Sequence, residues 1–495
     1  MEILYKSTRG DGETVTASRA ILQGLSDDGG LFVPDHIPQL DISPDELAKM
    51  DYRGVAYEVM SRFLSDFTED ELKSCIANAY DEKFDTEEIA PLIKKDGVYF
   101  MELYHGATIA FKDMALSILP HLMTVSARKN NITNEIVILT ATSGDTGKAA
   151  LAGFAGVPNT KIIVFYPKGG VSRIQELQMV TQKGENTFVC GVKGNFDDCQ
   201  SAVKKMFNDP ALKEELAAGG YQFSSANSIN IGRLVPQVAY YVWAYSRLVS
   251  NGEIKAGDKI NFVVPTGNFG NILAGYYAKL MGLPVNKLIC ASNENKVLYD
   301  FFESGIYDRN RKFILTSSPS MDILISSNLE RLIYKVVGES GQENRRLMKD
   351  LSEKGFYELP AQAKEKLSDF AGGFAGEEEN FAGIRALYEN DGYVIDTHTG
   401  VAYSVYRNYR ENTQDSLPCV IVSTASPYKF ARAVMGAIDK KYEAEDDFRL
   451  IEELEQLSGR PVPNAVKDIM DADIRHKTVC ETNELENEVK GFLAL

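Results

Sequence analysis

The sequence predicts an α/β protein built on parallel sheets, and three observations lead to that fold class. From about residue 100 onward, short β-branched runs are each followed by a glycine or serine turn and then by a helical pattern. These runs are apolar without interruption, as expected of strands that are buried on both faces. Before them, apolar residues recur at helical spacing through most of the first 95 positions.

Four strand–turn–helix units define the predicted sheets. The strand and the turn of each unit are 135–140 with 143–147, 161–166 with 167–170, 261–264 with 265–271, and 419–422 with 423–427. Ligands of parallel α/β sheets bind beyond the carboxyl ends of the strands, which is where these turns lie. We therefore expect the turns to form the functional site.

A chain of 495 residues is too long for one compact core, so we expect several domains. The patterns predict a mostly helical N-terminal domain over 1–95, an α/β core over 96–435 with a smaller lobe at about 130–235, and a helical C-terminal extension over 436–495. Ser43 and Pro44 are typical of an N-cap and a first-turn proline. The glycine- and glutamate-rich stretch 371–379 is typical of a flexible surface loop.

Composition argues against several classes of function. The net charge of −17 would repel a nucleic-acid backbone, so nucleic acid is not an expected partner. No run approaches the roughly 18 apolar residues of a membrane span, and the first residues lack the pattern of an export signal. Six scattered cysteines without a C-x-x-C pair indicate reduced thiols and a cytoplasmic protein. The five histidines show no metal-binding spacing, so no metal is expected.

The most informative turn contains Gly267, Asn268, Phe269, Gly270 and Asn271. Its glycines allow the backbone to approach a ligand closely, and the helix that follows would direct free N–H groups at it. The combination is typical of a phosphate-binding loop, although a tight strand-to-helix turn has the same composition.

A second turn of this kind runs from Ser143 to Lys148. It is not a nucleotide P-loop, because Thr142 stands where that motif has a glycine and Ala149 where it has a hydroxyl residue. Ser143 and Thr146 would either bind an anion or only cap the helix.

Lys112 stands between apolar neighbours at the expected start of a helix. Once desolvated there, its amine would have the lowered pKa that a Schiff-base amine requires, whereas the alternative is an ordinary surface lysine. Ser228, Asn230 and Arg233 share one helix start and would either bind a phosphate or cap that helix. A lysine, a glycine-rich phosphate loop and a strand-end hydroxyl at Thr424 are together the parts that a pyridoxal phosphate enzyme needs.

With these parts in view, the sequence resembles the threonine synthases of the longer bacterial and fungal type. The resemblance follows an ordered series of segments, namely 7–10, 24–34, 102–113, 140–147, 226–230, 267–271 and 424–430. It implies the fold-type-II architecture of tryptophan synthase β chains, in which two α/β lobes surround the cofactor and an N-terminal domain is added.

The resemblance also implies an activity, the conversion of O-phosphohomoserine and water to threonine and phosphate, with pyridoxal 5'-phosphate held as a Schiff base on Lys112. By position, the loop 267–271 would bind the cofactor phosphate and Thr424 the pyridine nitrogen. Ser143, Asp145 and Thr146 would lie near the ring oxygen and the substrate carboxylate, and Ser228, Asn230 and Arg233 near the substrate phosphate. Ala107, Lys148 and Ser426 depart from the family pattern, where proline, a small residue and histidine are usual.

Three alternatives stay open beside this interpretation. A serine or threonine dehydratase or a cysteine synthase would share the lysine and the glycine loop but needs no second phosphate site. A threonine-synthase-like phospho-lyase would eliminate phosphate without adding water. A non-catalytic descendant would have little reason to keep Lys112 and both loop glycines. The sequence does not distinguish a monomer from a homodimer.

Overall fold

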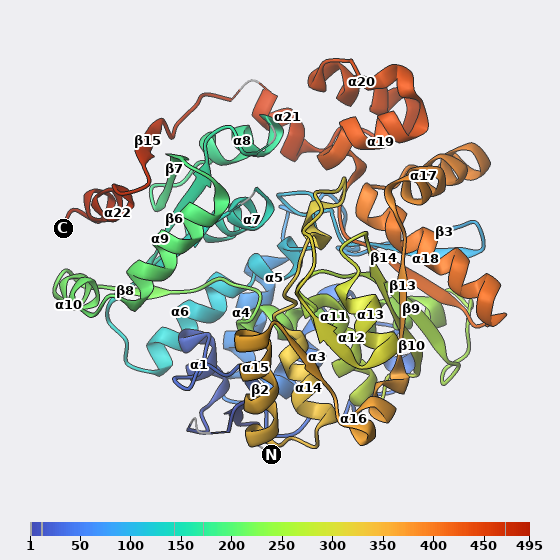
Figure 1. Ribbon diagram of the computed structural model, residues 1–495, viewed down its shortest axis with the longest axis horizontal. Helices are drawn as coiled ribbons and strands as arrows, with labels where there is room; N and C mark the ends of the chain where they lie inside the picture. Colours follow the sequence, from blue (N-terminus) through green and yellow to red (C-terminus); the bar gives the residue numbers. More distant parts are fainter. Residues whose placement is uncertain (1, 11–12, 143, 172, 471) are drawn as a thin grey trace.

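The structure is a computed structural model that describes residues 2–10, 13–142, 144–171, 173–470 and 472–495. Figure 1 shows two α/β lobes side by side, a smaller one that carries β5 to β7 and a larger one that carries β9, β10 and β14. Helices of the N-terminal region lie against the larger lobe, and α3 packs on α11. The predicted two-lobed α/β architecture is confirmed.

The N-terminal region is mostly helical, as predicted. Ser43 caps its second helix through a hydrogen bond of 3.2 Å from the Glu46 N–H, and Pro44 opens that helix, which confirms both residues as a helix start. The elements are β1 (Tyr5–Ser7), α1 (Ala17–Gln23), β2 (Phe32–Pro34), α2 (Pro44–Leu47), α3 (Tyr52–Phe63) and α4 (Glu69–Ala79), and β1 pairs with β2 in antiparallel register.

The larger lobe is built on a six-stranded sheet of order β13-β10-β9-β14-β4-β3. All neighbours are parallel except β3 and β4, and every residue of β9 and β14 is buried, as continuous apolar strands between helical layers should be. The strands are β3 (Leu92–Lys95), β4 (Val98–Glu102), β9 (Ile260–Pro265), β10 (Val285–Ser292), β13 (Phe370–Phe374) and β14 (Cys419–Ser423), with a separate pair β11 (Ile306–Asp308) and β12 (Phe356–Glu358).

The remaining helices of the core belong to the larger lobe or lie between it and the smaller lobe or the N-terminal region. They are α5 (Asp113–Leu116), α6 (Leu119–Lys129), α11 (Ile231–Ser250), α12 (Gly270–Leu280), α13 (Val297–Ser304), α14 (Leu329–Val336), α15 (Gly341–Lys354), α16 (Ala361–Glu365), α17 (Glu377–Asp391) and α18 (Thr397–Thr413), with short 3-10 turns η1 (Pro319–Met321), η2 (Lys366–Asp369) and η3 (Pro427–Phe430). Among the helices described, none is long and apolar enough to cross a lipid bilayer.

The expectation of a flexible loop over 371–379 was wrong. This stretch contains most of β13, which pairs with β10, and the first residues of α17. Its glycines serve packing, because a Cβ atom at Gly373 would lie only 2.4 Å from Cγ1 of Val405 on α18. The close approach of a helix to the sheet requires glycine here, so a glycine run was mistaken for a loop.

The smaller lobe is a five-stranded parallel sheet of order β15-β7-β6-β5-β8. Its strands are β5 (Glu135–Ala141), β6 (Thr160–Pro167), β7 (Thr187–Lys193), β8 (Tyr221–Ser224) and β15 (Thr478–Glu481), and its helices are α7 (Asp145–Phe154), α8 (Arg173–Val180), α9 (Phe196–Asn208), α10 (Pro210–Ala218) and α22 (Leu485–Leu493). The predicted strands at 135–140 and 161–166 are therefore both present, in adjacent parallel register.

The C-terminal extension was expected to be helical, but it also contains a strand. After α19 (Ala431–Ile438), η4 (Lys440–Tyr442), α20 (Asp447–Ser458) and α21 (Asn464–Met470), the chain returns to the smaller lobe and adds β15 at the edge of its sheet. Figure 1 shows this red segment beside β7, and α21, which precedes it, already packs on α8 of the smaller lobe. A four-residue strand that is only partly buried carries too weak a pattern to be found in the sequence.

An ionic cluster around the buried Glu102 connects three regions of the chain. Glu102 at the end of β4 accepts from Arg460 of the C-terminal extension at 2.8 Å and from the Tyr393 hydroxyl at 2.6 Å. His105 lies between Glu102 Oε2 at 3.0 Å and Asp85 Oδ1 at 2.5 Å. Burial disfavours the imidazolium, but the two carboxylates outweigh burial and raise the pKa of His105 to about 9.

Candidate active site

The lysine singled out in the sequence stands at the N-cap of α5, beyond the carboxyl end of β4. Its side chain is 11% exposed. Burial lowers the pKa of Lys112, as predicted, against the attraction of Asp145. Ile109, three residues earlier, has a left-handed φ of 52°, which is strained for a β-branched residue and typical of functional sites.

Two polar groups meet the Lys112 amine. Its Nζ donates to the Ser320 hydroxyl at 3.1 Å and lies 3.6 Å from Asp145 Oδ2. Asp145 opens α7 on the smaller lobe, whereas Ser320 belongs to the larger lobe. The amine therefore lies where the two lobes face each other, which is the expected site for a ligand of this fold.

Asp145 is surrounded by donors from four segments. Besides Lys112, it contacts Lys429 Nζ at 3.2 Å and accepts from Ser320 Oγ at 3.0 Å and from Gln175 Nε2 at 3.0 Å. Burial opposes its ionisation, but the ammonium groups of Lys429 and Lys112 hold the pKa of the Asp145 carboxyl well below its usual range. Asp145 is thus an ionised carboxylate inside the site.

The turn before α7 is braced by Thr142, whose hydroxyl accepts from the N–H groups of Gly144 and Gly147, each at 3.0 Å. Thr146 follows in the first turn of α7 beside Asp145. Ser143 lies outside the described residues. The substrate contacts inferred for Ser143 and Thr146 stay predictions.

The glycine loop 267–271 joins β9 to α12, as predicted. Phe269 adopts a left-handed φ of 64°, and a Cβ atom at Gly267 would lie 2.3 Å from the Ser320 carbonyl oxygen. The loop is fixed from outside, since Ser326 Oγ donates to Gly267 O at 2.7 Å and Asn328 N donates to Asn268 O at 3.1 Å.

Asn271 at the start of α12 indicates that this loop fits a phosphate. Its Oδ1 accepts from the hydroxyls of Tyr240 and Tyr241, each at 2.7 Å, which turns the NH₂ group the other way. Among the described residues, the buried Asn271 Nδ2 has no hydrogen-bond partner. A free buried donor next to the unpaired N–H groups of a helix start is suited to an anionic oxygen, such as those of the pyridoxal phosphate group.

The three candidates at the start of α11 differ in whether their polar groups already have partners. Asn230 caps α11 and donates from Nδ2 to Ile21 O at 2.9 Å, so its amide already has structural partners. Ser228 Oγ lies 3.5 Å from Asn328 Nδ2, the group that also donates to Asn268 O, and therefore adjoins the glycine loop. Arg233 is 4% exposed. The proposed phosphate contacts of all three residues stay predictions.

Arg233 is the group best suited to a second anion. Its Nη1 donates to Ala226 O at 3.0 Å, whereas its buried Nε has no partner within the described part of the chain. Burial lowers the pKa of Arg233 to about 10, so the guanidinium remains charged at neutral pH. A buried guanidinium with a free donor favours binding of an anion.

Thr424 follows β14 and lies beside the lysine segment. Its carbonyl accepts from Phe111 N at 2.8 Å, and Ala425 forms an isolated bridge with Ala110. The contact of its hydroxyl with a pyridine nitrogen stays a prediction. Ser426, one of the departures from the family pattern, caps η3 by accepting from Tyr428 N at 3.3 Å.

Buried cations outnumber buried carboxylates around Lys112. Lys429 and Lys148 both donate to the Thr108 carbonyl, at 3.1 and 3.3 Å, and burial lowers the pKa of Lys148. Within the described residues, the buried basic groups of the site are Lys112, Lys148, Arg233 and Lys429, and the buried acidic groups are Asp113, Asp145 and Asp396. The excess of positive charge favours anionic ligands.

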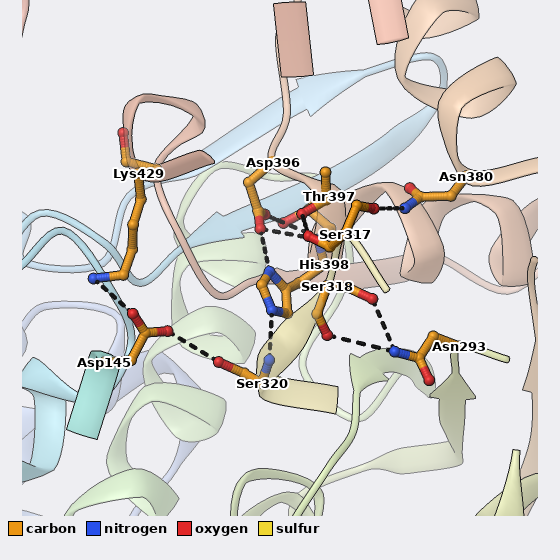
Figure 2. Close-up of polar contacts among 12 residues, drawn as sticks. Asp145, Asn293, Ser317, Ser318, Ser320, Asn380, Asp396, Thr397, His398 and Lys429 are labelled. Atoms are coloured by element: carbon orange, nitrogen blue, oxygen red, sulfur yellow. Dashed lines mark hydrogen bonds and ion pairs between the residues drawn. The ribbon is translucent and has the colours of Figure 1, made fainter. Parts of the chain in front are cut away.

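Four residues of the site were not predicted from the sequence, and Figure 2 shows them together with Asp145, namely Ser320, Asp396, His398 and Lys429. Lys429 lies inside the 424–430 segment used for the resemblance and was passed over there. His398 was considered only as a metal ligand, although an aspartate two positions before it is a detectable signal. Ser320 lies in a serine-rich loop without a distinctive pattern.

Three family models match the chain. They are Threonine synthase N terminus over residues 4–80, Pyridoxal-phosphate dependent enzyme over 84–425, and Threonine synthase, C-terminal over 399–489. The second range contains Lys112, the glycine loop and Thr424.

Curated relatives and a solved structure agree with these models. Threonine synthase-like 1 of Macaca fascicularis is 41% identical over 437 residues, which cover 86% of this chain and only 58% of that protein's length. Threonine synthase of Saccharomyces cerevisiae is 36% identical over 488 residues, with 92% of this chain and 93% of that protein covered. The crystal structure of PLP-bound threonine synthase from Brucella melitensis has a TM-score of 0.88 at 34% identity and covers 100% of both chains.

These matches confirm three predictions from the sequence, namely the family resemblance, the fold-type-II class and the pyridoxal 5'-phosphate cofactor. The near-complete coverage by the yeast relative and by the Brucella structure extends the likeness beyond the cofactor-binding core to both ends of the chain. The chain belongs to the threonine synthase family of pyridoxal-phosphate dependent enzymes.

Proposed function

We propose that this protein converts O-phosphohomoserine and water to threonine and phosphate, with pyridoxal 5'-phosphate attached to Lys112. The observation that carries the proposal is a pair of buried donors without a hydrogen-bond partner among the described residues, the Asn271 Nδ2 of the glycine loop and the Nε of the Arg233 guanidinium. A cofactor phosphate and a substrate phosphate need two such sites, whereas a dehydratase needs one.

The residues present fit the cofactor. Lys112 Nζ would bond to its aldehyde carbon, the loop 267–271 would bind its phosphate through backbone N–H groups and Asn271 Nδ2, and Thr424 would face its pyridine nitrogen. The bound cofactor withdraws electrons from the substrate, so that protons at Cα and then at Cβ become acidic enough to leave.

The protein's own residues then have three tasks. Lys112 Nζ, whose pKa burial lowers, would accept and return protons at the substrate carbons. Arg233 and Ser228 would bind the substrate phosphate and hold it until it leaves, while Thr146 in the first turn of α7 would bind the substrate carboxylate together with Ser143. Packing of both lobes around Lys112 would exclude bulk water from these transfers.

The direct test is an assay of O-phosphohomoserine with the cofactor-loaded enzyme, in which phosphate and threonine are both quantified. Equal amounts of the two products are expected. Phosphate without threonine would identify a phospho-lyase, and deamination of serine or threonine without phosphate release would identify a dehydratase. Either result would overturn the proposal.

We also propose that the protein acts in the cytoplasm, since all six cysteines are free and buried, as expected where thiols stay reduced. Its assembly as a monomer or a homodimer is left to a mass measurement in solution.

A further inference from the structure

Ser320 occupies the position between the two groups that define the site. Its hydroxyl accepts from Lys112 Nζ at 3.1 Å and donates to Asp145 Oδ2 at 3.0 Å, so both hydrogen-bonding roles of the hydroxyl are used. The direct distance from Lys112 Nζ to Asp145 is longer, at 3.6 Å. Ser320 is therefore the nearest hydrogen-bond acceptor of the amine, and Asp145 acts on the amine partly through it.

The backbone of Ser320 is fixed by a buried histidine. Ser320 N donates to His398 Nε2 at 3.1 Å, and His398 Nδ1 lies 2.7 Å from Asp396 Oδ2, as Figure 2 shows. Since Nε2 accepts a hydrogen bond, the ring proton is on Nδ1 and is donated to Asp396, so the imidazole is neutral. His398 and Asp396 are 2% and 0% exposed. Asp396 also caps α18, since its Oδ2 accepts from His398 N at 2.9 Å and its Oδ1 from Thr399 N at 3.0 Å, so the start of this helix and the Ser320 amide are fixed together.

The rest of the 316–322 segment is equally constrained. Asn293 Nδ2 donates to Thr316 Oγ1 at 2.9 Å, to Ser318 Oγ at 3.0 Å and to Asp322 Oδ1 at 2.8 Å. Ser317 O accepts from Thr397 Oγ1 at 2.7 Å, next to His398 on α18. The segment is thus a rigid platform that presents one hydroxyl to Lys112.

The chemistry explains why such a hydroxyl is useful. In the proposed reaction the substrate amine would replace Lys112 on the cofactor, so the released lysine amine would have to be held near the carbons whose protons it moves. An N–H of the neutral amine that is donated to Ser320 leaves the nitrogen lone pair directed away from Ser320, toward the space in which cofactor and substrate react. The same geometry favours attack of the apoprotein's amine on the cofactor aldehyde.

We propose that Ser320 is a further catalytic residue, whose hydroxyl orients the Lys112 amine whenever that amine is not bonded to the cofactor, and that His398 with Asp396 positions it. The role in turnover rests on the proposed function. The role in cofactor capture does not, because capture requires no substrate.

The test measures capture of pyridoxal phosphate by the apoprotein, followed as the rise of the visible absorbance band. Ser320→Ala and Ser320→Cys should both slow capture by roughly 10-fold or more, the loss expected for one hydrogen bond to a buried reacting amine, since a thiol is a poor substitute for the hydroxyl. They should lower kcat on O-phosphohomoserine by at least as much while KM changes less than about threefold. Ser74→Ala, which removes an exposed hydroxyl on α4, is the matched control and should capture at the wild-type rate.

The positioning residue is tested by a pair of variants. His398→Leu removes the acceptor for Ser320 N and should slow capture, whereas His398→Gln offers an amide oxygen in its place and should restore part of the rate. The proposal would be overturned if both folded Ser320 variants captured the cofactor at the wild-type rate. It would also be overturned if His398→Leu and His398→Gln slowed capture equally at unchanged melting temperature. If the Ser320 variants capture the cofactor slowly but the wild-type enzyme releases no phosphate from O-phosphohomoserine, the role of Ser320 in cofactor capture would stand and the proposed substrate would be rejected.

Discussion

Replacing Arg233 by glutamine tests whether its buried guanidinium binds the substrate phosphate. The side chain is 4% exposed, and its Nε is free among the described residues. With a pKa of about 10 the group remains cationic at the pH of an assay. Glutamine keeps a donor that can reach the Ala226 carbonyl but removes the charge and the planar two-donor edge.

The expected loss follows from the number of donors that become free to bind. A hydrogen bond to a charged group contributes about 1.5–3 kcal/mol, and one or two such bonds to a phosphate would be lost. A loss of about 1.5–6 kcal/mol in substrate binding corresponds to a rise in KM of about 10- to 20,000-fold. The fall in kcat should be smaller, because the contact to the phosphate exists before the chemical step.

The assay is phosphate release over a range of O-phosphohomoserine concentrations, and Arg247→Gln is the matched control. Arg247 lies on the same helix, about 21 Å further along it at 1.5 Å per residue. It also donates to a backbone carbonyl, Ala48 O at 2.6 Å, and has a buried Nε without a partner in the described structure. Arg247→Gln should lower stability and leave KM within about twofold. An unchanged KM in Arg233→Gln, or an equal rise in both variants, would refute the assignment of the phosphate to Arg233.

Three further predictions use other parts of the structure. Lys112→Ala should abolish the visible band and all turnover while circular dichroism and melting temperature stay near wild type, and cofactor that becomes covalently attached to this variant on reduction with borohydride would contradict the attachment site. The pKa of His105 is raised to about 9 by its two carboxylate neighbours, so its contribution of about 1–3 kcal/mol to the free energy of unfolding is present below pH ~6.5 and is lost as the pH rises through 9. His105→Gln should therefore flatten the decline in melting temperature between these pH values. An unaltered slope would exclude His105 as the cause of the decline. Gly373→Ala should lower stability in urea unfolding by about 1–3 kcal/mol because the added methyl meets Val405, whereas Gly491→Ala, with open space around it, should be neutral or stabilising, and equal effects would contradict the packing argument.

The framework of the fold could be predicted because the central strands carry strong local patterns. The continuous apolar runs at 135–140, 161–166, 261–264 and 419–422 became β5, β6, β9 and β14, and the turns after β5, β9 and β14 meet around Lys112. The strand at 370–374 was missed because its glycines are required by a neighbouring helix and not by its own backbone. Tertiary packing of that kind has no local signature.

Only part of the site could be predicted from the sequence, as was the case for the fold. Lys112 and the loop 267–271 have local reasons for their residue types, a desolvated helix start and a close backbone approach. Ser320 and His398 are 78 positions apart and form one unit only because α18 packs under the 316–322 segment. A hydrogen bond from a backbone N–H to a histidine leaves no mark on the sequence around the N–H, so this half of the site became visible only in three dimensions.

The position of β15 has a consequence for the order in which the protein matures. The outer strand of the smaller lobe is encoded at 478–481, nearly 300 residues after its partner β7 at 187–193. A ribosome therefore completes the larger lobe while the edge of β7 still lacks its neighbour, and the last residues must leave the exit tunnel before that edge is covered. The nascent chain spends most of its synthesis with an open sheet edge, which makes this edge a candidate contact for chaperones and the first place where a truncated chain would aggregate.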